Sequence, residues 1–223
     1  MPLADNFFLL VHDGSGRSLL HSRATAYGLA ASVLLDLAGT GHIVLRQRLV
    51  IARSSIDHPA GLAAGGRIPP PATPLLHHVW EQIQRERQPL DVRTWLAALA
   101  PTITDTVGER LGRAGLVRVQ EVGVVRRSHR YVPVDRLASA KISAILGSKL
   151  ASRARLDWDD VLLAGLASAT GLQGEILATD QTGAGQAYLG ELFQEVRQRY
   201  PDILMLFTET EAAVGDAVIT HRS

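Results

Sequence analysis

The sequence predicts a mainly α-helical protein, a compact helical domain with short β-hairpins. Apolar residues recur at the three- and four-residue spacing of helices over most of the chain. Several of these stretches begin at a residue that caps helices and end at a glycine. A helical stretch followed by glycine and two short extended pieces also occurs twice, over residues 34–53 and 107–127. Together these observations indicate a helical fold interrupted by hairpins.

Composition bounds both the fold and the function. The chain has 223 residues, 46% hydrophobic and 20% charged, which fits one globular domain spanning residues 1–223. It has no cysteine, which excludes disulfides, thiolate catalysis and cysteine-based zinc sites. No apolar run approaches the ~20 residues that cross a bilayer, and the N-terminus does not resemble a signal peptide. We therefore expect a cytoplasmic protein whose contact with any membrane is peripheral.

The first quarter of the chain contains one expected helix and one expected hairpin. An apolar run over residues 7–11 leads into the polar, glycine-containing turn at residues 12–16. Apolar spacing predicts a helix over residues 25–37, and glycines stop it. Two short strands are then expected at residues 43–45 and 49–52.

A glycine- and proline-rich segment over residues 57–73 predicts a flexible loop. Thr73 is expected to cap the helix that follows, and Asp91 is expected to cap the next one. Pro101 is expected to interrupt this second helix, which runs on to residue 114. All three tryptophans of the chain are assigned to the core.

The second half contains a hairpin and then helices. Residues 116–119 and 122–125 are expected to form two strands, with a third extended piece at residues 131–132. Asp157 is expected to cap a helix because carboxylates favour the positive end of the helix dipole. Helices are expected around residues 142–146, 157–166, 188–196 and 213–218.

The two helix–glycine–hairpin copies each resemble a winged-helix unit, in which a hairpin packs beside the preceding helix. In the second copy the hairpin is basic and should protrude. Residues 110–136 hold seven arginines and two acidic residues, for a formal charge of +5. Val124 and Val125 are expected to enter a membrane interface while Arg126, Arg127 and Arg130 meet phosphates. The alternative is a solvated hairpin whose charges protect an edge strand from aggregation.

The order and spacing of several motifs resemble the Golgi phosphoprotein 3 family over nearly the whole chain. They are the Phe8-Leu9-Leu10-Val11-His12-Asp13 opening with Gly16, Gly28-Leu29, Leu34-Leu35-Asp36-Leu37-Ala38, Gly41-His42-Ile43, Arg110-Leu111, Gly115-Leu116 and Leu162-Leu163-Ala164-Gly165-Leu166-Ala167. The composition, rich in Ala, Gly and Arg with only Lys141 and Lys149 as lysines, is typical of a bacterial GC-rich genome.

The resemblance implies a mostly helical domain that opens with a leucine-rich strand. It further implies a peripheral membrane protein that binds phosphatidylinositol 4-phosphate and carries the cytoplasmic tails of partner proteins. The hairpin of such a protein inserts into lipid or exchanges between subunits, which makes an oligomer conceivable.

The chain departs from the family at its lipid-binding positions. The family's tryptophan corresponds to His21 and one arginine corresponds to Ala30. By the spacing from Gly115, two further arginines correspond to Pro101 and Thr104. The head-group site is therefore not inherited residue by residue.

Four residues of this chain are the candidates for binding an anionic lipid head group. His21 and Arg23 lie in the loop where the family holds the head group, and a protonated His beside an Arg suits phosphate. Arg110 and Arg113 begin the basic segment. The alternative for His21 and Arg23 is an ordinary exposed loop.

Two rival functions remain open. Residues 116–133 also suit a winged-helix-like nucleic-acid-binding protein, because guanidinium groups bind phosphates and guanine edges alike. The second rival function is a protein-interaction module that has lost lipid binding. Nothing predicts an enzyme, a metal or a cofactor: there is no H-E-x-x-H, G-x-S-x-G or G-x-x-x-x-G-K motif. His77 and His78 are adjacent and so point to different helix faces.

Overall fold

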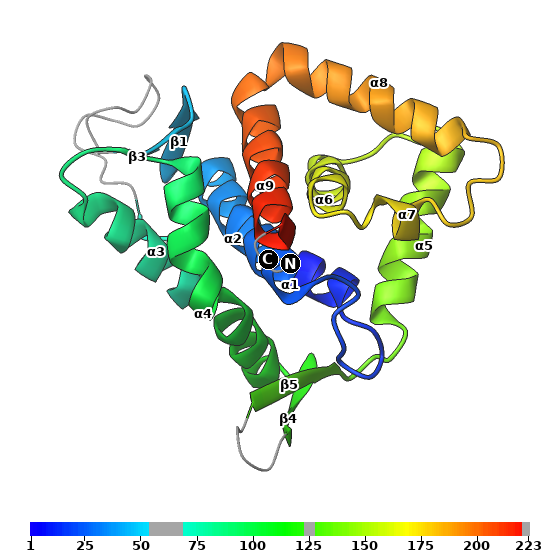
Figure 1. Ribbon diagram of the computed structural model, residues 1–223, viewed down its shortest axis with the longest axis horizontal. Coiled ribbons are helices and arrows are strands. Elements are labelled where there is room, and N and C mark those ends of the chain that lie inside the picture. Colours follow the sequence, from blue (N-terminus) through cyan, green and yellow to red (C-terminus); the bar gives the residue numbers. More distant parts are fainter. Residues whose placement is uncertain (54–68, 123–127, 220–223) are drawn as a thin grey trace.

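The computed structural model describes residues 1–53, 69–122 and 128–219, which form a mainly helical fold with two small antiparallel sheets (Figure 1). Buried apolar side chains from the first to the last helix form one contiguous core. The mainly helical fold class with short hairpins is confirmed. The elements are α1 (Leu3–Val11), α2 (Ser22–Gly39), β1 (Ile43–Arg46), β2 (Leu49–Ala52), α3 (Pro74–Arg85), β3 (Leu90–Asp91), α4 (Val92–Arg113), β4 (Val117–Val122), β5 (Ser128–Pro133), α5 (Ala138–Ala151), α6 (Trp158–Ala169), α7 (Gln173–Ile176), α8 (Ala184–Arg199) and α9 (Pro201–Ile219).

Helix α1 is the centre of the molecule. It contacts α2, α4, α5 and α6, and only Asn6 among its residues is not fully buried. The strand implied at the start of the chain is therefore wrong. A helix buried on all sides shows no 3.6-residue periodicity, so its short apolar run cannot be distinguished from a strand by sequence alone.

Residues that carry the family resemblance hold α1 against α2. A Cβ atom on Gly28 would overlap the ring of Phe7 and lie 2.9 Å from the side-chain methyl of Thr170, so only glycine allows this approach. The carboxylate of Asp36 accepts hydrogen bonds from the backbone N–H groups of Leu3 at 3.1 Å and Ala4 at 3.3 Å. Asp36 thus satisfies two of the otherwise unpaired donors at the start of α1.

Helix α4 is continuous, so the expected interruption at Pro101 is wrong. Proline removes one helical hydrogen bond, but the buried side chains of Leu99, Ile103 and Val107 on its two sides pack in the core. Packing of an apolar face outweighs the local cost here, as it does for most helices in proteins. The caps expected at Thr73, Asp91 and Asp157 are confirmed.

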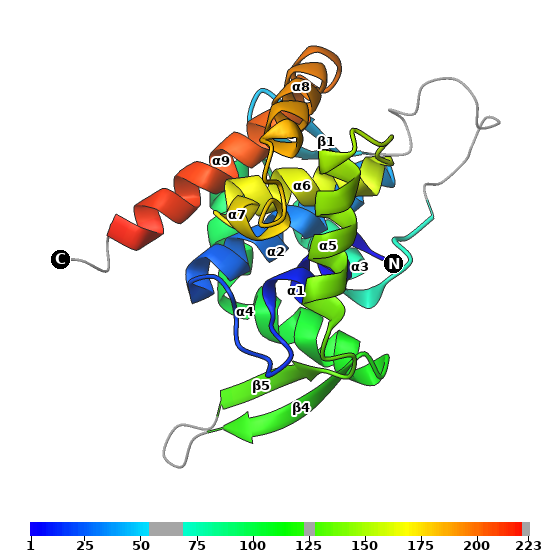
Figure 2. The same ribbon diagram turned by 90° about the vertical axis from the view of Figure 1, so that its right-hand side faces the viewer.

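The two hairpins follow the expected helix–glycine–hairpin order, but the strands of the second have different bounds from those expected. β4 continues to Val122 and pairs with β5 from Val117↔Pro133 to Val122↔Ser128, so residues 116–119 and 122–125 are not two separate strands. The register follows from the packing of Val117 and Tyr131 under α4. Figure 2 shows this hairpin projecting from the helices. Residues 57–68 of the expected loop, and Val124, Val125, Arg126 and Arg127 at the expected membrane-contacting tip, lie outside the described residues.

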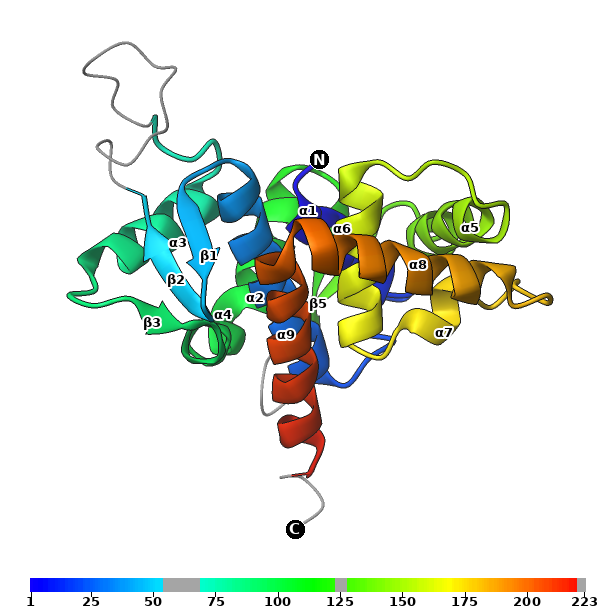
Figure 3. The same cartoon turned by 90° about the horizontal axis from the view of Figure 1, so that it is seen from above.

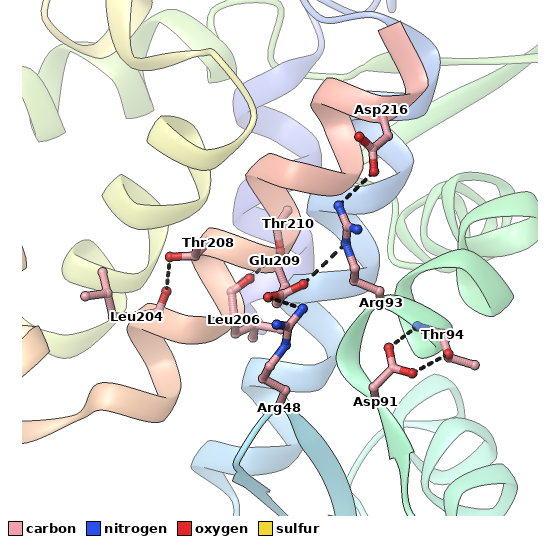
Figure 4. Close-up of polar contacts among 10 residues, drawn as sticks. All are labelled: Arg48, Asp91, Arg93, Thr94, Leu204, Leu206, Thr208, Glu209, Thr210 and Asp216. Atoms are coloured by element: carbon pink, nitrogen blue, oxygen red, sulfur yellow. Dashed lines mark hydrogen bonds and ion pairs between the residues drawn. The ribbon is translucent and has the colours of Figure 1, made fainter. Parts of the chain in front are cut away.

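Helix α9 lies between the β1–β2–β3 sheet with α3 on one side and α5 to α7 on the other (Figure 3). Glu209 of α9 pairs with Arg48 of the β1–β2 turn at 2.8 Å and with Arg93 of α4 at 3.3 Å, and Arg93 also pairs with Asp216 at 2.8 Å (Figure 4). These ion pairs join three elements that are distant in sequence.

The assignment of all three tryptophans to the core is wrong for Trp158. Trp95 is buried and Trp80 is half-buried, but Trp158 is 39% exposed and its ring packs at 4.7 Å from that of Tyr200. Trp158 is the first residue of α6, and the hydrogen bonds of the Asp157–Asp160 capping box position it at the surface.

Candidate functional site

A cavity of about 640 Å³ opens between the loop after α1, the start of α2 and the middle of α4. We call it the α2–α4 cavity. From the loop and α2, its lining includes His12, Ser18, Ser22, Arg23, Thr25, Ala26 and Tyr27; from α4, it includes Ala97, Ala100, Pro101, Thr104 and Asp105. The positions on α4 are three or four residues apart, so they share one face of that helix.

The α2–α4 cavity is lined by both polar and apolar side chains and carries few charges. Among the described residues that line it, Arg23 supplies the one guanidinium and Asp105 the one carboxylate. The hydroxyl groups of Ser18 and Thr25 form a hydrogen bond with each other at 2.7 Å. The Tyr131 hydroxyl donates to Asp105 at 3.0 Å, and burial, with a further contribution from this bond, raises the pKa of Tyr131. Tyr131 therefore remains a protonated donor that holds Asp105 at the cavity.

His12 forms a neutral part of the cavity wall. Its ring is 6% exposed, stacks on Phe8 at 4.1 Å between ring centroids, and lies 2.8 Å through Nδ1 from the Phe8 carbonyl. A carbonyl only accepts, so the proton sits on Nδ1 and Nε2 is an acceptor. Burial lowers the pKa of His12, although the Phe8 carbonyl and Asp13 act in the opposite direction.

This lowered pKa predicts a pH-dependent loss of stability. In the unfolded chain the His12 imidazole binds a proton near its ordinary pKa of 6.5, whereas the folded protein resists protonation until a lower pH. The stability that is present above 6.5 is therefore lost as the pH falls towards the folded pKa, by up to about 1.4 kcal/mol per pH unit. Urea unfolding of the parent and of His12→Gln at several pH values between about 7 and 5 measures this.

Replacing His12 should remove that part of the pH dependence. The matched control is His78→Gln, on the exposed side of α3, which should keep the slope of the parent protein. A slope unchanged in His12→Gln would contradict the prediction.

One of the predicted head-group residues, Arg23, lines the α2–α4 cavity, and a second, His21, lies two residues before it in sequence. His21 is the N-cap of α2, where its Nδ1 accepts from the Arg23 N–H at 3.4 Å. Pro101 and Thr104, which the resemblance in sequence aligns with family arginines, also line this cavity. Ala30, which corresponds to a third arginine, is fully buried within α2.

The other two predicted residues lie on the opposite side of α4. Arg110 and Arg113 line a second cavity of about 490 Å³, together with Pro74, Leu75 and other residues. Arg110 forms an ion pair with Asp5 of α1, which is only 4% exposed. Arg113 is exposed at the end of α4. The structure thus does not bring the four predicted head-group residues together.

The β4–β5 hairpin has two different faces. Tyr131 packs on α4 so closely that a Cβ on Gly108 would lie 2.6 Å from its ring. On the other face, the register places Arg118 opposite Val132 and Arg130 opposite Gln120, so the two arginines share one side. The hairpin adjoins the cavity because Tyr131 reaches Asp105 and because the loop after α1 lies against β5 at Gly16.

Exposed apolar residues lie at the base of this hairpin. Leu116 is 38% and Val134 is 49% exposed, and the Val134 N–H donates to the Leu116 carbonyl at 2.9 Å. Arg113 and Arg136, both exposed, come close to them in sequence. Apolar and basic side chains therefore occur together where the hairpin leaves the helices.

Sequence reasoning did not identify His12, Ser18, Thr25, Tyr27 or Asp105 as cavity residues. One signal pointed to their neighbourhood: Pro101 and Thr104, which the spacing from Gly115 aligned with family arginines, lie on the face of α4 that lines this cavity. The loop after α1 is far from α4 in sequence, so only the packing of α2 against both α1 and α4 brings these side chains together.

Within residues 1–53, 69–122 and 128–219, no three or more His, Asp or Glu side chains are placed to hold a metal ion. In the same ranges, every helix is too short or too polar to cross a membrane.

Fold and site together define a mainly helical protein with a cavity of mixed polar and apolar lining beside a projecting basic hairpin. The chain belongs to the Golgi phosphoprotein 3 (GPP34) family, whose model matches residues 3–218. This confirms the resemblance read from the sequence. The family consists of non-enzymatic, adaptor-type proteins that bind phosphatidylinositol 4-phosphate. Among curated proteins, none matches the chain.

Proposed function

We propose that this protein is a non-enzymatic adaptor that binds anionic lipid head groups at the cytoplasmic surface of a membrane. The α2–α4 cavity with Arg23 and His21 would receive the head group. The β4–β5 hairpin would lie on the lipid. The observation that carries this proposal is a projecting hairpin next to a cavity lined in part by polar side chains. Arg118 on the hairpin is exposed and Arg130 is half-buried, and exposed Leu116 and Val134 lie at the hairpin base.

The two signals on the hairpin reinforce each other. An arginine near an anionic bilayer contributes about 1 kcal/mol, and this attraction decays within a Debye length. Exposed apolar side chains such as Leu116 and Val134 add burial in the interface. Either signal alone gives weak binding, whereas the two together give stable peripheral attachment.

Removing the arginines of the outer face tests the proposal. In Arg118→Ala/Arg130→Ala, binding to vesicles that contain an anionic lipid should weaken about 30-fold, since two charges contribute about 2 kcal/mol. Co-sedimentation with vesicles at two salt concentrations measures this, and the effect should shrink at high salt.

The control variant removes two positive charges at a distance from the hairpin. Arg155 precedes α6 and Arg197 lies on α8, both exposed, and Figure 1 shows α8 at the end of the molecule opposite the hairpin. Arg155→Ala/Arg197→Ala should bind vesicles like the parent. Equal losses in the two variants would mean that only net charge matters and would contradict a hairpin contact.

The proposal also includes partner-protein tails and exchange of the hairpin between subunits. Among the described strands β4 pairs with β5 alone, and a strand at the edge of a sheet is a surface to which a further strand can add. Nucleic-acid binding is the competing function. Retention of duplex DNA that falls with salt, without retention of anionic vesicles, would favour it.

A further inference from the structure

The charge of the α2–α4 cavity limits which head groups it can hold. Arg23 and Asp105 cancel each other, and His12 is neutral. A phosphomonoester carries a charge of about −1.5 to −2 near pH 7 and is bound in proteins by several cationic donors. The described lining of this cavity offers one such donor and one carboxylate that repels the ligand. A singly charged phosphodiester matches Arg23 alone.

The hydrogen-bonding groups point to a ligand with hydroxyl groups. Asp105 and the Nε2 atom of His12 are acceptors only, so a ligand must bring hydrogens to them. A phosphate dianion has no hydrogen to donate, whereas the hydroxyl groups of a polyol ring have several. The hydroxyl groups of Ser18 and Thr25 can donate or accept, so each can bind a ligand hydroxyl group in either role.

Asp105 is fixed in place for this role. The Tyr131 hydroxyl occupies its Oδ1 atom, while Tyr131 itself is 3% exposed and packed against Gly108. The carboxylate therefore keeps its orientation without a ligand, and this preorganisation favours binding.

We infer that the α2–α4 cavity selects a polyol head group joined to lipid through a phosphodiester, and not one that carries a phosphomonoester. The ligand hydroxyl groups donate to Asp105 and His12, and Arg23 pairs with the single phosphate charge. This inference rests on the proposed function, because it names the ligand class of the same cavity.

Vesicle binding by the full-length protein separates this inference from the proposed function. We compare phosphatidylcholine vesicles that contain phosphatidylinositol, phosphatidylserine or phosphatidylinositol 4-phosphate at matched total charge. The expected result is tighter binding to phosphatidylinositol than to phosphatidylserine, with no gain from the 4-phosphate. Preference for phosphatidylinositol 4-phosphate, or equal binding to all three, would overturn the inference and leave the proposed function standing.

Soluble head groups give a second readout that needs no membrane. Calorimetric titration should show glycerophosphoinositol binding at least as tightly as inositol 1,4-bisphosphate. Failure of glycerophosphoinositol to bind would overturn the inference even if vesicles bind. Binding of glycerophosphoinositol without any vesicle binding would support the inference and contradict the membrane function.

Asp105→Asn tests the carboxylate without changing its shape. The amide oxygen still accepts from Tyr131, so the fold should be kept. Glycerophosphoinositol should bind about tenfold more weakly, since hydrogen bonds to charged groups are the stronger ones, and inositol 1,4-bisphosphate should bind more tightly. The matched control Glu211→Gln, at an exposed position of α9, should change neither affinity. Unchanged affinities in Asp105→Asn would overturn the inference.

Discussion

Replacing Arg110 with alanine should lower the free energy of unfolding by about 3–5 kcal/mol near neutral pH, because it leaves the buried carboxylate of Asp5 without its partner. Burial already raises the pKa of Asp5, and the Arg110 guanidinium offsets this only in part. Without Arg110 the pKa of Asp5 should rise further. Urea unfolding followed by circular dichroism measures the loss.

The loss should depend on pH in a defined direction. A carboxyl group whose folded pKa lies above its unfolded value reduces stability as the pH rises through that interval. The destabilisation by Arg110→Ala should therefore be larger near pH 7 than near pH 5, where Asp5 is more readily protonated.

Arg113→Ala is the matched control on the same helix. Arg113 is exposed near the end of α4, so its removal should change the free energy of unfolding by at most about 0.5 kcal/mol. If Arg110→Ala were equally harmless, the Asp5–Arg110 pair would not support the fold. A loss of vesicle binding in Arg110→Ala could come from unfolding. Its free energy of unfolding must therefore be measured together with its binding.

Gly28→Ala should lower the free energy of unfolding by about 3 kcal/mol, at the upper end of the usual cost of overfilling a core. The added methyl group would overlap the buried ring of Phe7 and crowd Thr170. This cost opposes the gain in helix propensity, which is about 1 kcal/mol for glycine to alanine within a helix.

Gly190→Ala provides the same substitution where space is open. Gly190 is exposed within α8, and a Cβ there would meet nothing within 4 Å. It should raise the free energy of unfolding by up to about 1 kcal/mol. Opposite signs for the two variants in urea unfolding support the packing argument, whereas a gain in both would contradict it.

The two stability predictions concern residues that belong to the motifs of the family or pack against them. Gly28 and Asp36, which belong to the motifs of the resemblance, hold α1 against α2. Asp13 organises the turn after α1 by accepting from the backbone of Ser15 at 2.8 Å and Arg17 at 2.9 Å. These residues maintain the fold. Pro101 and Thr104 line a cavity outside the core, and His21 caps the helix that borders it.

The sequence by itself determined the elements whose signals are local. The caps at Thr73, Asp91 and Asp157 and the helix–glycine–hairpin order depend on neighbouring residues, and all were predicted. The family match also follows from sequence, since motif order survives even where single ligand-binding residues change.

Only the tertiary structure decided how distant segments meet. The short apolar run of α1 could be a helix or a strand by sequence alone, and the packing around Pro101 overrides its local effect. Arg110 and Arg113 lie only a few residues from Asp105 in sequence, yet helical geometry turns them to the opposite side of α4. The charge and hydrogen-bonding character of the α2–α4 cavity depend on such placements, because a binding site is defined by distances in space that no local pattern encodes.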